Sequence, residues 1–123
     1  MEILHIAEQI DKKIQQLDKG KDLLENAAKE KARTLADYDL AIAKTLAGLK
    51  NGAEFELGGQ KIKDPAISLA EKYARGICAE QKFDAEMAEG QYKAIITKLN
   101  VIMAQMNGYQ SINRYLESST RGD

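Results

Sequence analysis

The sequence has very little of several residues that commonly define a fold or a reaction. Among its 123 residues there is no tryptophan, one proline, one histidine and one cysteine. A chain with so few turn-forming prolines favours long helices over a turn-rich β fold. Hydrophobic residues make up 44% and charged residues 30%, which is typical of a folded domain of this length. The sequence therefore predicts one mostly α-helical domain over residues 1–123.

The same absences exclude several kinds of chemistry. With His5 as the one imidazole, no histidine-based metal site can form, and we expect neither a metal nor a cofactor. The lone Cys78 cannot form an intramolecular disulfide and suits a small buried side chain in a reducing cytoplasm. No Gly-rich phosphate loop is present, since Gly58-Gly59 lacks the following Lys-Ser/Thr. These absences predict a protein that is not an enzyme.

Charge and hydropathy limit the partners and the location. No apolar run approaches the roughly 18 residues that span a bilayer, so we expect no membrane contact. The first residues lack the pattern of a signal peptide, which favours a cytoplasmic protein. The net charge is −1, whereas proteins that follow a nucleic-acid backbone usually carry a clear basic excess. This balance argues against nucleic acid as the main partner.

The first half of the chain has the apolar spacing of a coiled-coil helix. From Ile10 to Leu49 apolar or alanine positions recur at steps of four and three, interrupted by a few polar members. Gly20 is a weak point, because a glycine inside a helix costs up to about 1 kcal/mol relative to alanine. The Asn-Gly pair at 51–52 suits a left-handed helix end. We therefore expect a helical segment over residues 1–51, with a break allowed near 18–21.

A short segment after this helix has the pattern of a β-hairpin. Between Phe55 and Lys63, apolar and polar residues alternate on both sides of Gly58-Gly59. Two glycines can both take a positive φ, as the tightest hairpin turns require. An isolated hairpin is marginal in water, so this one must contact the helices or another subunit. The predicted hairpin covers residues 53–63.

The rest of the chain predicts a long C-terminal helix over residues 64–118. Asp64 suits a helix cap and Pro65 the first helical position. A continuous helix would be roughly 80 Å long, far longer than a compact domain of this size. Breaks at Gly76, Gly90 or Gly108 are possible, but we expect the apolar stripe to pair with a second copy. The predicted fold is mostly α: two long helices in a dimeric coiled-coil-like core decorated by a short β-hairpin, forming a homodimer or a higher homo-oligomer.

The segment from Gln91 to Leu116 contains no Asp or Glu and has a formal charge of +3. Its last part, residues 107–115, concentrates amides, two tyrosines and Arg114. An arginine binds phosphate through its fork of N–H groups, tyrosine stacks on a base, and amides bond base edges. Phe83 lies off the apolar stripe and is a candidate stacking platform. The composition therefore suits a ligand with a flat ring and a phosphate, although plain helix packing explains the same positions.

At this point the chain resembles the first type of phage anti-Thoeris protein. The resemblance rests on the helix–hairpin–helix layout, on Phe83 in Gln-Lys-Phe-Asp, on Tyr92 in Gly-Gln-Tyr-Lys and on the Asn-Gly-Tyr-Gln-Ser-Ile-Asn-Arg-Tyr stretch. Members of that family are decorated dimeric coiled coils. They sequester the cyclic ADP-ribose isomers that signal infection in Thoeris bacterial defence, without cleaving them. The resemblance implies a non-catalytic, cytoplasmic nucleotide sponge that acts in an infected bacterial host cell.

The family's pockets combine an aromatic platform with arginines of the C-terminal helix, which implies roles for residues of this chain. Arg114 and Arg121 would bind the pyrophosphate, Phe83 would stack on adenine, and Asn113 or Asp123 would bond ribose hydroxyls. The full set of candidate ligand-binding residues is Phe83, Tyr92, Asn107, Gln110, Asn113, Arg114, Arg121 and Asp123.

Two other hypotheses remain open. The heptad spacing alone also fits a coiled-coil interaction protein, such as an accessory phage factor without a small-molecule ligand. A third hypothesis is an accessory protein for single-stranded DNA, which would use the basic helix with Tyr92, Tyr109 and Tyr115. The acidic residues at 80–89 can in principle hold a divalent cation, but a solvated helix face explains them more simply.

Overall fold

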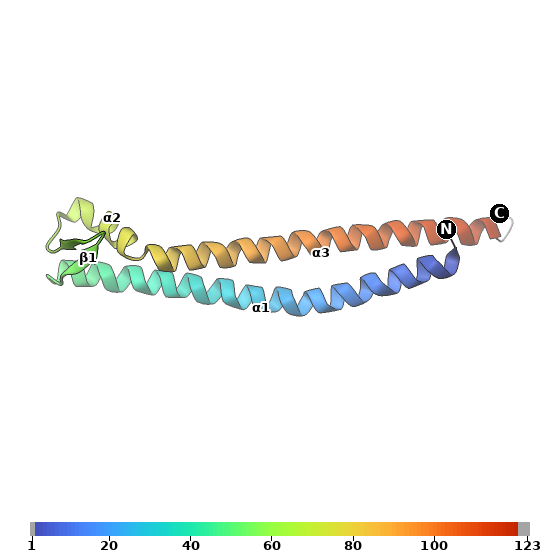
Figure 1. The fold of residues 1–123 in the computed structure, drawn as a ribbon, viewed down its shortest axis with the longest axis horizontal. Helices are drawn as coiled ribbons and strands as arrows, with labels where there is room; N and C mark the ends of the chain where they lie inside the picture. The colour runs from blue at the N-terminus through green and yellow to red at the C-terminus, as the bar shows by residue number, and fades with distance from the viewer. Residues whose placement is uncertain (1, 121–123) are drawn as a thin grey trace. The chain divides into compact units, whose positions relative to one another are not determined.

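The computed structural model describes residues 2–120. Along these residues it contains α1 (Ile3–Lys50), β1 (Phe55–Leu57), β2 (Gln60–Ile62), α2 (Ile67–Ile77) and α3 (Ala79–Thr120) (Figure 1). The contacts divide the chain into two compact units. The first unit takes its described residues from Met1–Ala27 and Gln91–Asp123, and the second unit is Ala28–Gly90. The predicted mostly α fold, with two long helices that pack together and a small hairpin, is confirmed.

In the first unit, the start of α1 pairs with the second part of α3 in the antiparallel direction (Figure 1). On both helices the residues that form the seam are spaced alternately three and four apart, as in a coiled coil. The buried or half-buried seam residues are Ile6, Ile10, Lys13, Leu17, Gly20, Leu24 and Ala27 on α1 and Tyr92, Ile95, Leu99, Ile102, Met106, Tyr109, Asn113 and Leu116 on α3. The α3 stripe is thus largely covered within one chain, which corrects the expectation that only a second copy can cover it.

Gly20 of α1 lies in close contact with Leu99 of α3 in the first unit. A Cβ atom at this position would overlap Cδ2 of Leu99, so only glycine fits without a shift of the leucine. Helix α1 continues without a break through this position, because the close contact offsets the helix cost of the glycine. Ile6 is fully buried in the same seam, and burial of such a side chain contributes about 1.5–3 kcal/mol.

The hairpin of the second unit forms as predicted. Phe55 pairs with Ile62 and Leu57 with Gln60 in an antiparallel register. Gly58 and Gly59 have φ angles of +57° and +79°, the conformation of a tight two-residue turn.

The hairpin is supported by the helices of its own unit. The Phe55 ring lies against Gly48 of α1, where Cζ would be 2.8 Å from an added Cβ. The Leu57 side chain lies against Gly76 of α2, where its Cδ2 would be 3.1 Å from an added Cβ. The two glycines therefore leave room for the two apolar side chains of β1.

The C-terminal helix begins later than predicted and is divided in two. Asp64 has a φ of +47° and makes no cap, and the helix cap is Ala66, without a side-chain hydrogen bond. A turn at Cys78, with φ −94° and ψ 19°, separates α2 from α3. The Cys78 N–H still donates to the Ala74 carbonyl at 3.0 Å, and the Cys78 carbonyl accepts from the Lys82 N–H at 3.1 Å, so both backbone groups of Cys78 stay hydrogen-bonded at the turn. The predicted continuous helix over 64–118 is thus corrected to two helices.

The bend at Cys78 is fixed by burial in the second unit. Cys78 is 2% exposed, and its Sγ lies 3.3 Å from Oγ1 of Thr45, which is 6% exposed. Leu49, Ala70 and Ala74 are also buried in this unit. Small side chains let α1 and α2 approach closely, and we infer that this packing, rather than the nearby Gly76, sets the place of the bend.

The contact between Gly20 and Leu99 generates a testable prediction. A Gly20→Leu substitution should lower the free energy of unfolding by about 1–3 kcal/mol, because the seam has no room for the side chain. Gly90→Ala is the matched control in α3: an added Cβ there meets nothing within 4 Å, and it should raise stability by up to about 1 kcal/mol. Urea titration followed by circular dichroism measures both. Equal stability of Gly20→Leu and wild type would contradict the close seam.

Candidate functional site

Four of the predicted ligand-binding residues lie together on the last turns of α3. Asn107 and Arg114, seven residues apart, are both exposed on one side of the helix. Gln110 is half-buried between them. Asn113 is also half-buried but belongs to the seam, and its amide N–H donates to Oε1 of Glu117 at 3.3 Å. The surface formed by Asn107, Gln110 and Arg114, here called the amide–arginine patch, carries hydrogen-bonding groups of both kinds and one positive charge.

Of the other predicted residues, Tyr92 shares the first unit with this patch but lies apart from it. Tyr92 is half-buried in the seam of α3, 15 residues before Asn107, which is about 22 Å along a helix. Phe83 belongs to the second unit, and 61% of its surface is exposed. Arg121 and Asp123 lie outside the described residues. The structure therefore groups Asn107, Gln110 and Arg114 on one side of α3, and the complete set of candidate residues stays a prediction.

The second unit contains a hollow that sequence reasoning missed. It lies between α1 and α3, has a volume of about 420 Å³ and is lined by Lys31, Leu35, Tyr38, Lys82, Ala85, Glu86 and Glu89. The size is within the usual range for small-ligand sites. Lys31 was the sequence signal for this hollow, because it is polar at a position where the heptad spacing predicts an apolar residue.

The charges of this hollow do not favour a pyrophosphate. Two lysines and two glutamates line it, so its formal charge is zero. An anion such as pyrophosphate is bound best where cations are in excess. Phe83 directly follows Lys82 in the sequence but is absent from the lining. The hollow is therefore a weaker candidate for a nucleotide than the amide–arginine patch.

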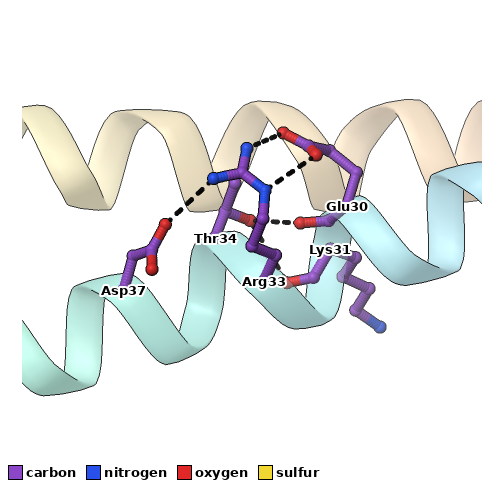
Figure 2. Close-up of polar contacts among 5 residues, drawn as sticks. All are labelled: Glu30, Lys31, Arg33, Thr34 and Asp37. Carbon is purple, nitrogen blue, oxygen red and sulfur yellow. Dashed lines mark hydrogen bonds and ion pairs between the residues drawn. The ribbon is translucent and has the colours of Figure 1, made fainter.

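Arg33 forms an exposed ion-pair network with Glu30 and Asp37 on α1 in the second unit (Figure 2). Arg33 donates from Nε to Glu30 Oε2 and from Nη1 to Asp37 Oδ2, each at 3.1 Å. The hydrogen bond to Glu30, and then the charge of that carboxylate, raise the pKa of the Arg33 guanidinium. Because two carboxylates already bind this exposed arginine, it is a poor candidate for binding a phosphate.

The side chain next to this network points inward. Thr34 is 5% exposed, and its hydroxyl donates to the Glu30 carbonyl at 2.9 Å (Figure 2). This bond satisfies a polar group that the α1 seam buries. Thr34 is therefore a structural residue.

The described residues contain neither a group of metal ligands nor a helix suited to a membrane. In residues 2–120 no three His, Cys, Asp or Glu side chains are placed so that they could hold a metal ion, and this includes the acidic residues at 80–89. Within the same stretch, none of the helices has the length and apolar content that crossing a bilayer requires. Comparison with models of protein families, with curated proteins and with solved structures finds no match for the chain.

The exposure of Phe83 generates a prediction that separates a binding role from a packing role. Phe83→Ala should change the free energy of unfolding by about 0.5 kcal/mol or less, because most of the ring is in solvent. The control Ile102→Ala, at a residue that is 8% exposed, should cost about 2–5 kcal/mol. Urea titration measures both. A cost above 2 kcal/mol for Phe83→Ala would show that the ring is part of a core.

Proposed function

We propose that this protein is a non-catalytic coiled-coil interaction protein that docks another protein along α3. The observation that carries the proposal is a line of apolar or small residues spaced seven apart and turned away from the seam of the first unit. This outer stripe consists of Ala94, Val101, Gly108 and Tyr115. Val101 is 52% exposed and Tyr115 is 71% exposed, and an added Cβ at Gly108 would meet nothing within 4 Å.

The spacing and the charge of the outer stripe favour a helical partner with acidic flanks. Residues that recur every seven positions lie on one side of a helix, where a second helix can pack along them. The segment from Gln91 to Leu116 has no acidic residue and a formal charge of +3, so acidic flanks on the partner would be attracted. The chain has one histidine, and its one cysteine is buried, so few side chains of the types that commonly act as a nucleophile or a general base are present. This supports a binding role.

The test is a pull-down with two variants, from a lysate of the cells in which the protein acts. Wild type should recover one stoichiometric protein partner. Val101→Lys with Tyr115→Lys should lose it, because two charges then interrupt the outer stripe. Leu40→Lys, at an α1 residue that is 55% exposed, is the control and should retain the partner. A partner that the double variant still binds fully, or no stoichiometric partner at all, would contradict the proposal.

A second candidate function is supported by the amide–arginine patch. Here the protein binds and sequesters a cyclic ADP-ribose isomer and so blocks bacterial Thoeris defence in the cytoplasm of an infected cell. Asn107, Gln110 and Arg114 place two amides and one guanidinium on one side of a helix segment that contains no acid. Arginine binds phosphate oxygens in a fork, and amides bond ribose or base edges.

Calorimetry with cyclic ADP-ribose isomers distinguishes the second candidate. Arg114→Ala should weaken binding at least about tenfold, because hydrogen bonds to charged groups are worth about 1.5–3 kcal/mol. Lys98→Ala removes one charge from the same helix outside the patch and should weaken binding less than about twofold. The absence of heat with every isomer, for a protein with full helical content, would exclude this function.

A further inference from the structure

The hollow between α1 and α3 in the second unit has an apolar wall that is open to solvent. Leu35 and Tyr38 of α1 form this wall together with Ala85 of α3. Leu35 is 49% exposed, and Tyr38 and Ala85 are half-buried. Ala85 ends in a single methyl group, so it fills little of the space beside the leucine and the tyrosine ring. A ligand in the hollow can therefore cover apolar surface of the chain, which favours binding.

Four charged side chains line the same hollow, and they differ in whether the chain already supplies a partner. Lys31 and Glu89 each take part in a further interaction within the chain. Lys82 and Glu86 are both exposed, and neither side chain makes a hydrogen bond or an ion pair with any of residues 2–120. Lys82 and Glu86 are thus the two charged groups of the hollow that are available to a ligand.

Lys82 and Glu86 present opposite charges about one helical turn apart. Residues four apart lie on the same side of a helix, with Cβ atoms about 5–6 Å from each other. A glutamate four residues before a lysine pairs well, whereas the order here, with the lysine first, is the weaker one. The two groups can therefore bind a positive and a negative group that lie close together in a ligand.

The charge and the size of the hollow restrict the ligand further. Its two lysines and two glutamates sum to a formal charge of zero, so a simple anion is repelled by the glutamates and a simple cation by the lysines. A zwitterion satisfies both signs. The volume of about 420 Å³ lies near the lower end of the range of about 300–1,000 Å³ for small-ligand sites, which favours a small molecule over a dinucleotide.

We propose that this hollow binds a free α-amino acid with a large apolar side chain. The Lys82 ammonium donates to the carboxylate of the amino acid, and the ammonium of the amino acid donates to the Glu86 carboxylate. The side chain of the amino acid lies against Leu35 and Tyr38. This site goes beyond the proposed function, because it belongs to the second unit and shares no residue with the outer stripe.

L-Phenylalanine is the probe, and an NMR titration of the ¹⁵N-labelled protein measures its binding. Saturable shifts should concentrate at the backbone amides of Lys82, Ala85 and Glu86. The Kd should be about 2 mM or tighter, the value that ordinary ligand efficiency gives for a molecule of this size. 3-Phenylpropanoic acid lacks the ammonium, 2-phenylethylamine lacks the carboxylate, and glycine lacks the ring. Each should bind at least about threefold more weakly, because one of the three contacts is lost.

Two variants of the chain test the assigned contacts. Glu86→Gln and Lys82→Met each remove one charge from the hollow and should weaken binding of L-phenylalanine at least about threefold. Glu80→Gln is the matched control, since Glu80 is an exposed glutamate of the same helix outside the lining, and it should change the Kd less than about twofold. Because all three side chains are exposed, each variant should keep the helical signal of wild type in circular dichroism.

Each other result has a definite meaning. The absence of localised shifts with about 20 mM L-phenylalanine would overturn the site. Binding of 3-phenylpropanoic acid or 2-phenylethylamine as tight as that of L-phenylalanine would also overturn it, since the hollow would then select a single charge. Equal weakening by Glu80→Gln and Glu86→Gln would show a general effect of charge and contradict the assigned contact. None of these results bears on the partner of the outer stripe, which the pull-down tests.

Discussion

The structure depends on a seam in which two helices of one chain meet at alternating steps of three and four residues. Within the first unit, Gly20 of α1 lies in close contact with the side chain of Leu99 of α3. A larger residue at position 20 would push the helices apart, and the apolar side chains on either side would lose contact. In the second unit the small buried groups Thr45, Ala74 and Cys78 fulfil the same role. Close helix contact therefore depends on small residues at a few defined positions.

A seam of this kind covers only part of the apolar surface that the sequence provides. Each helix has one strip in contact with its neighbour, and the third apolar position in seven remains beside the seam, as Ile14 and Met103 illustrate. The outer stripe with Val101 and Tyr115 is also uncovered. Because exposed apolar surface of this extent is uncommon in proteins that act alone, both surfaces support a binding role. Because the seam covers only one strip of each helix, the core of the single chain is small. The apolar surfaces that remain exposed include the outer stripe that the proposed function uses.

The sequence predicted the elements that depend on local chemistry. The first helix follows from its heptad spacing, and the hairpin follows from Gly58-Gly59 between alternating residues. A break in the second helix was allowed at Gly76, but its place at Cys78 was not predicted, because that turn depends on contacts with Thr45, which is 33 residues away. The covering of the α3 stripe by α1 was missed for the same reason. Periodicity identifies which face of a helix is apolar and leaves open which helix covers it.

The candidate site was predictable only in part. Asn107, Gln110 and Arg114 lie together because helical spacing alone brings them onto one side. Helical spacing cannot relate Phe83 to them, since it lies 24 residues before Asn107 and in the other compact unit. The hollow at Lys31 depends on side chains from two helices that only the folded chain brings together. Residues on a single helix can thus be grouped from sequence, and residues from two helices require the structure.

The central claim is that α1 and α3 pair within one chain, and a disulfide between two positions in contact across the seam tests it most directly. In a Gly20→Cys, Leu99→Cys variant the leucine side chain that fills the space is gone, and the two new Cβ atoms face each other across the seam. The account predicts that mild oxidation joins residues 20 and 99 of the same chain, so that the denatured, non-reduced protein keeps the mass of one chain. A disulfide found only between two chains would contradict it.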